Sequence, residues 1–175
     1  MINEKIKSRK FSGPIEAAGF TLIEIIVVLS VISMGLVGIL SLIIRNIDSQ
    51  SYNKDNLIAY QLSQEGIELI RHVRDSNWRT GDNFNDGLAA GHYYMDYLDD
   101  LPHATSSVVG AVLYRDSNGL YVHGATVGST ATAFSRGILI DEIDENSFRV
   151  LSRVSWNSRD RDYNYDLETV LYDWR

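Results

Sequence analysis

An α+β fold, with one long N-terminal helix packed on a small antiparallel β-sheet, is predicted by three features of the sequence. Residues 20–44 form an apolar run, residues 45–75 continue without proline in a one-sided pattern, and residues 76–175 hold short β-forming segments between turn residues. We therefore expect a basic leader over 1–19, a helix over 20–75 and a globular β-rich head over 76–175.

The apolar run is long enough to cross a membrane. It extends from Phe20 to Ile44, 25 residues that contain Glu24 as their single charged side chain. At ~1.5 Å per residue such a helix spans ~37 Å, which exceeds the ~30 Å of a bilayer's hydrocarbon layer. We expect the first half of the helix to be membrane-spanning and the second half to be amphipathic.

Charge is distributed unevenly along the chain. Residues 1–19 hold four basic and two acidic side chains, whereas the whole chain has a net charge of −7. A positive flank before an apolar span places that end on the cytoplasmic side. An acidic remainder argues against binding to a phosphate backbone, so no nucleic-acid partner is expected. The chain has no cysteine, which excludes disulfides and thiolate chemistry.

Glu24 distinguishes this segment from an ordinary secretory signal. A signal peptide has an apolar region of ~7–15 residues followed by a small-residue cleavage site. Here the run is longer, and the small residues Ala17, Ala18 and Gly19 precede it. A carboxylate in lipid costs ~2.5–3.5 kcal/mol and usually has a partner. A new α-amino group on Phe20, formed by cleavage of the Gly19–Phe20 bond, would provide one.

The segment at this junction resembles the signature of type IV prepilins. In that family a membrane aspartyl peptidase cuts after the glycine and methylates the new N-terminal phenylalanine. The resemblance implies cleavage after Gly19 and N-methylation of Phe20. The processing and assembly motif would comprise Gly19, Phe20, Thr21, Leu22, Ile23 and Glu24.

The second half of the helix and the head show weaker local patterns. Ile47, Ile58, Leu62, Leu69 and Val73 have spacings compatible with one helix face. Residues 76–91 contain many Gly, Asp and Asn and predict a loop. Segments 112–115 and 120–123 flank Asp-Ser-Asn-Gly and predict a hairpin. Further strands are expected within 91–97, 134–143, 148–156 and 166–174.

Two further segments resemble minor pilins of the PilV type. They are Ala59–Glu68, followed by Arg71, Arg74 and Asp75, and the C-terminal Leu167–Arg175. The resemblance implies a structural subunit that is inserted in the cytoplasmic membrane, head outside, before joining an extracellular filament. Its partners would be prepilin peptidase, an assembly ATPase and platform, membrane lipid, and other pilin subunits bound through the N-terminal helix.

Other functions stay open. A pseudopilin of a type II secretion or DNA-uptake system would share these features, and a signal-anchored adhesion protein would keep its leader. The aromatic run Tyr93, Tyr94 and Tyr97 and the pair Tyr163 and Tyr165 are candidates for an adhesive face, although aromatic residues on strands more often pack across the sheet. Asp160, Asp162, Asn164 and Asp166 alternate as in a calcium loop, but equally as on one face of a strand. With no H-E-x-x-H or G-x-S-x-G motif, we expect no catalytic residues, cofactor or metal.

Overall fold

The computed structural model describes residues 19–107 and 111–174, and confirms the α+β fold. One long helix, α1 (Leu22–Thr80), precedes seven strands that form one antiparallel sheet. The chain divides into two compact units, Met1–Ile47 and Asp48–Arg175. The strands are β1 (Gly91–Tyr94), β2 (His103–Thr105), β3 (Ala111–Arg115), β4 (Tyr121–His123), β5 (Thr130–Asp144), β6 (Ser147–Ser158) and β7 (Arg161–Tyr172).

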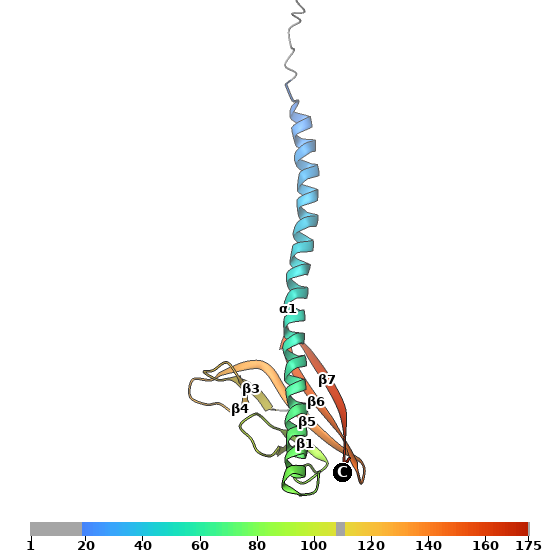
Figure 1. The fold of residues 1–175 in the computed structure, drawn as a ribbon. Helices are drawn as coiled ribbons and strands as arrows, with labels where there is room; N and C mark the ends of the chain where they lie inside the picture. The colour runs from blue at the N-terminus through green and yellow to red at the C-terminus, as the bar shows by residue number, and fades with distance from the viewer. Residues whose placement is uncertain (1–18, 108–110, 175) are drawn as a thin grey trace, which may run out of the picture. The chain divides into compact units, whose positions relative to one another are not determined.

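Strand β5 is the centre of the sheet. Along one side it pairs with β6, which pairs in turn with β7. Its other side is shared by β1, which continues to β2, and by β3, which continues to β4. Within the second unit, β5, β6 and β7 lie beside the C-terminal half of α1 (Figure 1). This arrangement gives the amphipathic half of the helix an apolar surface to cover.

The helix ends later than the sequence predicted. We expected it to stop near Asp75, but it continues to Thr80 because Trp78 is buried in the core. Gly81 then adopts a φ of 86°, and the amide of Asp82 donates to the carbonyl of Asn77 at 3.0 Å. This is the glycine-terminated cap that closes many helices. The predicted loop therefore begins at Gly81 rather than at Ser76.

The predicted hairpin is confirmed, while other strand boundaries differ. Strands β3 and β4 pair around the Asp116–Gly119 turn, with Arg115 opposite Tyr121. Strand β7 begins at Arg161, five residues before the expected start, because it pairs with β6 along the full length of that strand. Strand β2 was not predicted: His103–Thr105 is short and pairs only with β1.

The buried face of α1 lies close to the predicted one. Leu62 and Val73 are buried, and Ile58 and Leu69 are partly buried against the core, but Ile47 is exposed. The fully buried positions follow a helical period of three and four residues. They are Ala59, Leu62, Ser63, Gly66, Ile67, Ile70, Val73, Arg74 and Trp78.

Two apolar clusters join this face to the sheet. The larger cluster lies toward the C-terminal end of α1, and the smaller one surrounds the first buried turns of the helix. The larger contains Ile67, Ile70, Val73, Trp78, Phe84, Leu88, Met95, Ile138, Ile140, Phe148, Val150 and Leu171. The smaller contains Ala59, Leu62, Leu113, Phe134, Val154 and Trp156.

Helix and sheet approach each other closely at Gly66. A Cβ atom at this position would lie 2.4 Å from Ser152 Oγ and 3.3 Å from Ser152 Cβ. Glycine weakens a helix by ~1 kcal/mol relative to alanine, so a glycine here is explained by the space that β6 occupies. The Ser152 hydroxyl is buried and has no hydrogen-bond partner among the described residues.

A charged side chain crosses the same interface. Arg136 of β5 is fully buried and donates to the carbonyl of Leu62 at 3.1 Å and to the carbonyl of Met95 at 2.7 Å. Its guanidinium lies 3.3 Å from the carboxylate of Glu65. Burial lowers the pKa of Arg136, and the charge of Glu65 opposes that shift. Arg136 thus connects α1, β5 and the segment after β1 through one buried group.

The contact between Gly66 and Ser152 predicts a coupled pair of mutations. Gly66→Ala should lower the free energy of unfolding by about 1–2 kcal/mol, because overpacking outweighs the gain in helix propensity. Ser152→Ala should be nearly neutral, since it removes an unpartnered hydroxyl. The double variant should recover at least half of the loss. Urea unfolding of an Asp48–Arg175 fragment, followed by tryptophan fluorescence, measures this, and strictly additive effects would contradict the steric argument.

Candidate assembly helix and head surfaces

The predicted cleavage bond lies before the helix begins. Gly19, Phe20 and Thr21 are exposed and precede Leu22, the first residue of α1. The Phe20 side chain is 78% exposed, and no atom lies within 4 Å of a Cβ built on Gly19. A peptidase could therefore reach the Gly19–Phe20 bond without unwinding a helix.

Thr21 and Glu24 form the start of the helix. The amide of Glu24 donates to Thr21 Oγ1 at 3.4 Å, and the amide of Ile25 donates to the Thr21 carbonyl at 3.2 Å. Thr21 is therefore the N-cap, and Glu24 lies in the first turn, where the helix dipole favours an anion. The Thr-x-x-Glu spacing is typical of a capping box and was the overlooked sequence signal for this start.

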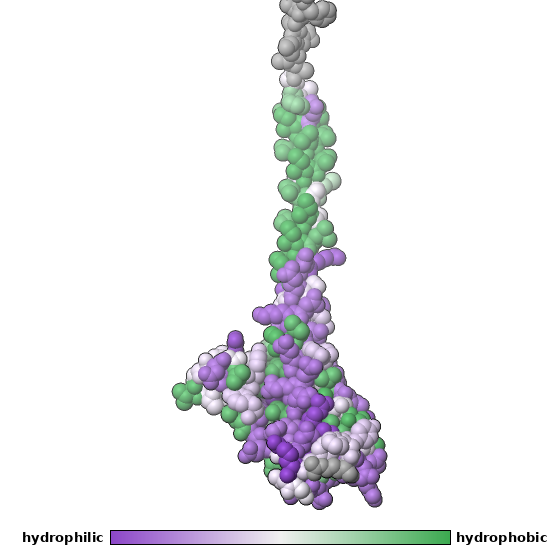
Figure 2. Space-filling model, in the orientation of Figure 1, coloured by the Kyte–Doolittle hydropathy of each residue, from purple (hydrophilic) through white to green (hydrophobic). Residues whose placement is uncertain are grey.

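Between Glu24 and Arg45 the helix surface is apolar apart from three serines. The apolar side chains of this part are about half exposed or more. Apolar residues cover the first half of the helix on the face seen in Figure 2. The hydroxyls of Ser30, Ser33 and Ser41 donate to carbonyls one turn earlier, at 2.9, 2.7 and 3.0 Å. These hydroxyls are thus satisfied without water, as a hydrocarbon environment requires.

Glu24 differs from those serines. No ion pair or side-chain hydrogen bond involves its carboxylate within the described residues 19–107 and 111–174. One helix near the N-terminus is long and apolar enough to cross a membrane, which is compatible with a membrane anchor. A lone carboxylate on such a helix requires a partner from outside these residues or costs free energy in lipid.

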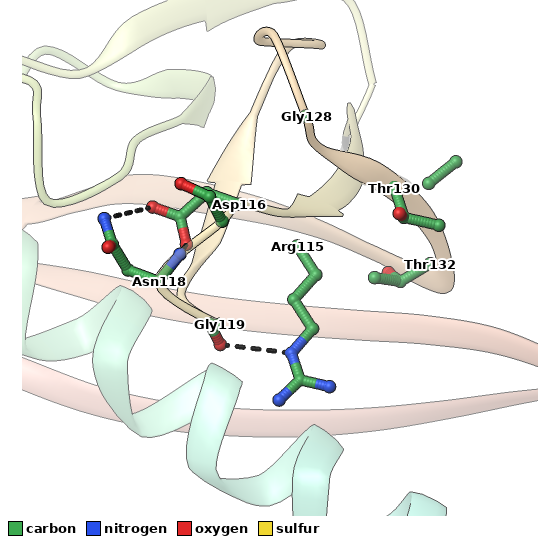
Figure 3. Close-up of a pocket in the computed structure, with 9 residues that line it drawn as sticks. Arg115, Asp116, Asn118, Gly119, Gly128, Thr130 and Thr132 are labelled. Carbon is green, nitrogen blue, oxygen red and sulfur yellow. Dashed lines mark hydrogen bonds between the residues drawn. The ribbon is translucent and has the colours of Figure 1, made fainter.

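The β3–β4 turn borders a polar hollow of about 570 Å³ (Figure 3). Arg115 Nε donates to the Gly119 carbonyl at 3.3 Å, and Asp116 Oδ1 accepts the amides of Asn118 and Leu120 at 2.9 and 2.8 Å. The Leu120 bond is the main cause that lowers the pKa of Asp116. Asp116 therefore holds the turn together as an ionised carboxylate. A general acid must carry a proton near neutral pH, so this geometry does not suit Asp116 to that role.

Two of the histidines, scattered in the sequence, meet around one tyrosine. The rings of His103 and His123 lie 5.2 and 5.1 Å from that of Tyr94. Asp99 contacts His103 at 2.9 Å, while Asp96 accepts the backbone amide of His123 at 2.8 Å. Tyr94 and His103 are paired on β1 and β2, whereas His123 lies on β4, and no local sequence signal predicts that these segments come together. Among the described residues, no three His, Asp or Glu side chains form a cluster that could hold a metal ion.

Of the alternating polar residues, Asp162, Asn164 and Asp166 lie on one face of β7, whereas Asp160 lies in the turn before the strand. Arg153 donates to both carboxylate oxygens of Asp166, at 2.7 and 2.6 Å, and Asn157 donates to Asp162 at 2.8 Å. Arg153 lowers the pKa of Asp166. The pattern is thus that of cross-strand pairs on an exposed sheet face.

Tyr163 and Tyr165 of β7 lie on the opposite face and pack inward, whereas Tyr172 is exposed. Tyr163 contacts Tyr52 of α1 at 5.2 Å between ring centroids, and Tyr165 contacts Tyr60 at 5.7 Å. Trp156 stacks on Tyr163 at 5.5 Å. These rings therefore join the sheet to the helix and do not form an exposed adhesive platform.

The buried imidazole of His123 should make the stability of the head depend on pH. Burial lowers its pKa to about 4, and neither ring nitrogen has a hydrogen-bond partner among the described residues. Between pH 6.5 and 4 the unfolded chain takes up a proton that the folded chain does not, so stability should fall as pH falls through this window. The expected loss is about 2–3 kcal/mol.

The test compares His123→Leu with the control His72→Gln, because His72 is exposed. Urea unfolding at pH 7 and pH 4.5 should show a smaller loss for His123→Leu than for the wild type. An unchanged pH dependence in His123→Leu would show that His123 is not the titrating group.

Comparisons with protein-family models, with curated proteins and with solved structures found no match to this chain. A functional assignment therefore depends on the chemistry of residues 19–44 and on the architecture of the head. The most informative feature is the position of Glu24, directly after an accessible Gly19–Phe20 bond and within a lipid-length apolar helix.

Proposed function

We propose that this chain is a prepilin whose mature form is a structural, non-enzymatic subunit of a type IV pilus-like filament. Prepilin peptidase cuts after Gly19 and methylates Phe20. The helix that begins at Leu22 anchors the protomer in the cytoplasmic membrane, with the head outside, and later packs among the helices of other subunits. The observation that carries the proposal is the carboxylate of Glu24 in an otherwise apolar helix.

The magnitudes favour a pairing partner for Glu24. Its position near the helix N-terminus gains about 0.3–1 kcal/mol from the helix dipole. Its burial in lipid costs about 2.5–3.5 kcal/mol. Helix capping therefore offsets only part of the cost. The α-amine of Phe20 in a neighbouring subunit supplies the missing positive charge, and neutralising both groups favours the assembled state over the isolated protomer.

The rest of the architecture is compatible with that use. Apolar side chains surround the first half of α1, so neighbouring helices can pack on any side once lipid is displaced. The sheet covers only the second half, from Ala59 onward. A minor pilin and a pseudopilin of a secretion or DNA-uptake apparatus both fit this division, and both require the assembly platform and its ATPase. A signal-anchored adhesion protein would retain residues 1–19.

Processing is tested by Gly19→Leu. The bulky side chain should prevent cleavage, because the peptidase site is built for glycine beside the scissile bond. Membranes of cells that contain the peptidase should then hold only the longer precursor, visible by gel mobility. Gly35→Leu, a control within the span where a Cβ meets no atom within 4 Å, should be cut normally. Cleavage of Gly19→Leu at the wild-type position would contradict the motif assignment.

Assembly is tested by Glu24→Ala. The variant should insert and be cut normally, since an isolated protomer gains nothing from a carboxylate in lipid. Its incorporation into sheared filaments should fall ~10²–10³-fold, because an unpaired buried charge costs ~3–5 kcal/mol. The ratio of filament to membrane protein measures this.

Thr21→Ala is the matched control for Glu24→Ala. It removes the N-cap bond at the same end of the helix and leaves the carboxylate in place. Loss of a cap costs about 1 kcal/mol, so incorporation should change only several-fold. If Glu24→Ala enters filaments as well as the wild type, the pairing mechanism is wrong for this subunit.

A further inference from the structure

The β6–β7 turn is unusual for a two-residue hairpin. Ser158 and Arg161 are paired, so Arg159 and Asp160 alone form the turn. Their φ angles are 54° and 59°, in the left-handed region. Turns of this kind usually contain Asn-Gly, because residues with side chains are strained there. Strained residues of this type often occur at ligand sites, which makes the surroundings of the turn informative.

The turn contacts the first residues of the second unit. Arg159 forms an ion pair with Asp48, which fixes the hairpin against α1. Beside this pair is a hollow of about 250 Å³, lined in part by Ser51, Tyr52 and Ser158. Arg161 also lines it, is exposed, and has no ion pair or side-chain hydrogen bond among the described residues. The hollow thus combines a guanidinium available for an anion with several hydroxyl groups.

The nearby acidic residues do not neutralise Arg161 directly. Asp48 is occupied by Arg159, and Asp162 accepts a hydrogen bond from Asn157 at 2.8 Å. Successive side chains of a strand point to opposite faces, so Asp162 and Arg161 are separated by the sheet. Asp160 lies in the turn itself and is exposed. Arg161 is therefore suited to bind a single anionic group in the hollow, rather than to attract a broad negatively charged surface.

Asp48, which the turn contacts, follows the apolar run closely in the sequence. Asp48 follows Ile44 by four residues, which corresponds to about 6 Å of helix. The headgroup layer of a bilayer extends roughly 5–7 Å beyond the hydrocarbon on each side. If residues 20–44 span a membrane, the four residues from Ile44 to Asp48 are too few to carry Asp48 far beyond the headgroup layer, and the ion pair with Arg159 ties the turn to Asp48.

We propose that this hollow binds the headgroup of an anionic phospholipid, with the Arg161 guanidinium on the phosphate and the Ser51 and Ser158 hydroxyls as further donors. An arginine fork matches the geometry of phosphate oxygens. The role of Arg159 is to hold the turn on α1 through Asp48. This inference rests on the proposed function only in requiring that residues 20–44 span a membrane. Bound lipid would hold the head at the membrane surface until assembly.

The test is native mass spectrometry of the full-length protein in detergent micelles with added phosphatidylglycerol or phosphatidylcholine. The wild type should retain one phosphatidylglycerol and little phosphatidylcholine. Arg161→Gln should lower the ratio of lipid-bound to free protein at least about fivefold, the expected contribution of one basic residue at an anionic surface. Equal retention of the two lipids by the wild type would overturn the proposal.

Arg115→Gln is the matched control, since it removes the same charge beside another hairpin turn (Figure 3). It should retain phosphatidylglycerol like the wild type, and an equal loss in both variants would show a nonspecific charge effect and overturn the site. If Arg161→Gln keeps its lipid but fails to enter filaments, Arg161 serves a neighbouring subunit and the lipid assignment is wrong. Alkaline extraction of membranes tests separately whether residues 20–44 span the bilayer. If the protein resists extraction but shows no preference between the two lipids, the lipid site is refuted and the proposed function is not.

Discussion

The close approach of β6 to α1 at Gly66 is the constraint on which the head depends. A side chain at this position would collide with Ser152, so only glycine lets the sheet cover the helix at this distance. The same contact brings Arg136 within reach of the Leu62 carbonyl and the Glu65 carboxylate. A buried guanidinium is costly unless its bonds are made, and a shifted register would leave it unpaired. The glycine thus allows close packing, and the arginine favours one arrangement of it.

This constraint also separates the two tasks of a single helix. From Ala59 to Trp78 one face of α1 is covered by the sheet, and the opposite face is polar. From Leu22 to Ile44, within the described part of the chain, no face is covered, and mostly apolar side chains surround the axis. The serines of that part satisfy themselves on backbone carbonyls, which leaves Glu24 as its distinctive polar group. The proposed function follows from this contrast: a helix that needs no partner for packing in lipid nevertheless carries a group that needs a partner for its charge.

Much of the fold could be predicted because its signals are local. The apolar run, the amphipathic continuation and the Asp116–Gly119 hairpin all depend on residues close in sequence. The helix end was missed because Trp78 is held by tertiary packing, and β2 because three residues carry too little pattern. The burial of Arg136 and the contacts of His103 and His123 with Tyr94 arise from tertiary packing of segments that are distant in the sequence. At the candidate processing site, the motif identified Gly19, Phe20 and Glu24. That Thr21 caps the helix, by accepting the amide of Glu24, became evident only from the structure.

The central claim is that the first half of α1 acts in an assembly only after residues 1–19 have been removed. The intact mass of the wild-type protein, isolated from membranes and filaments of its native cells, tests this most directly. The account predicts the mass of residues 20–175 with one added methyl group, and fragmentation should place that methyl on the Phe20 amine. Protein that retains residues 1–19 in cells with an active prepilin peptidase would contradict the account, and would identify the helix as a permanent signal anchor.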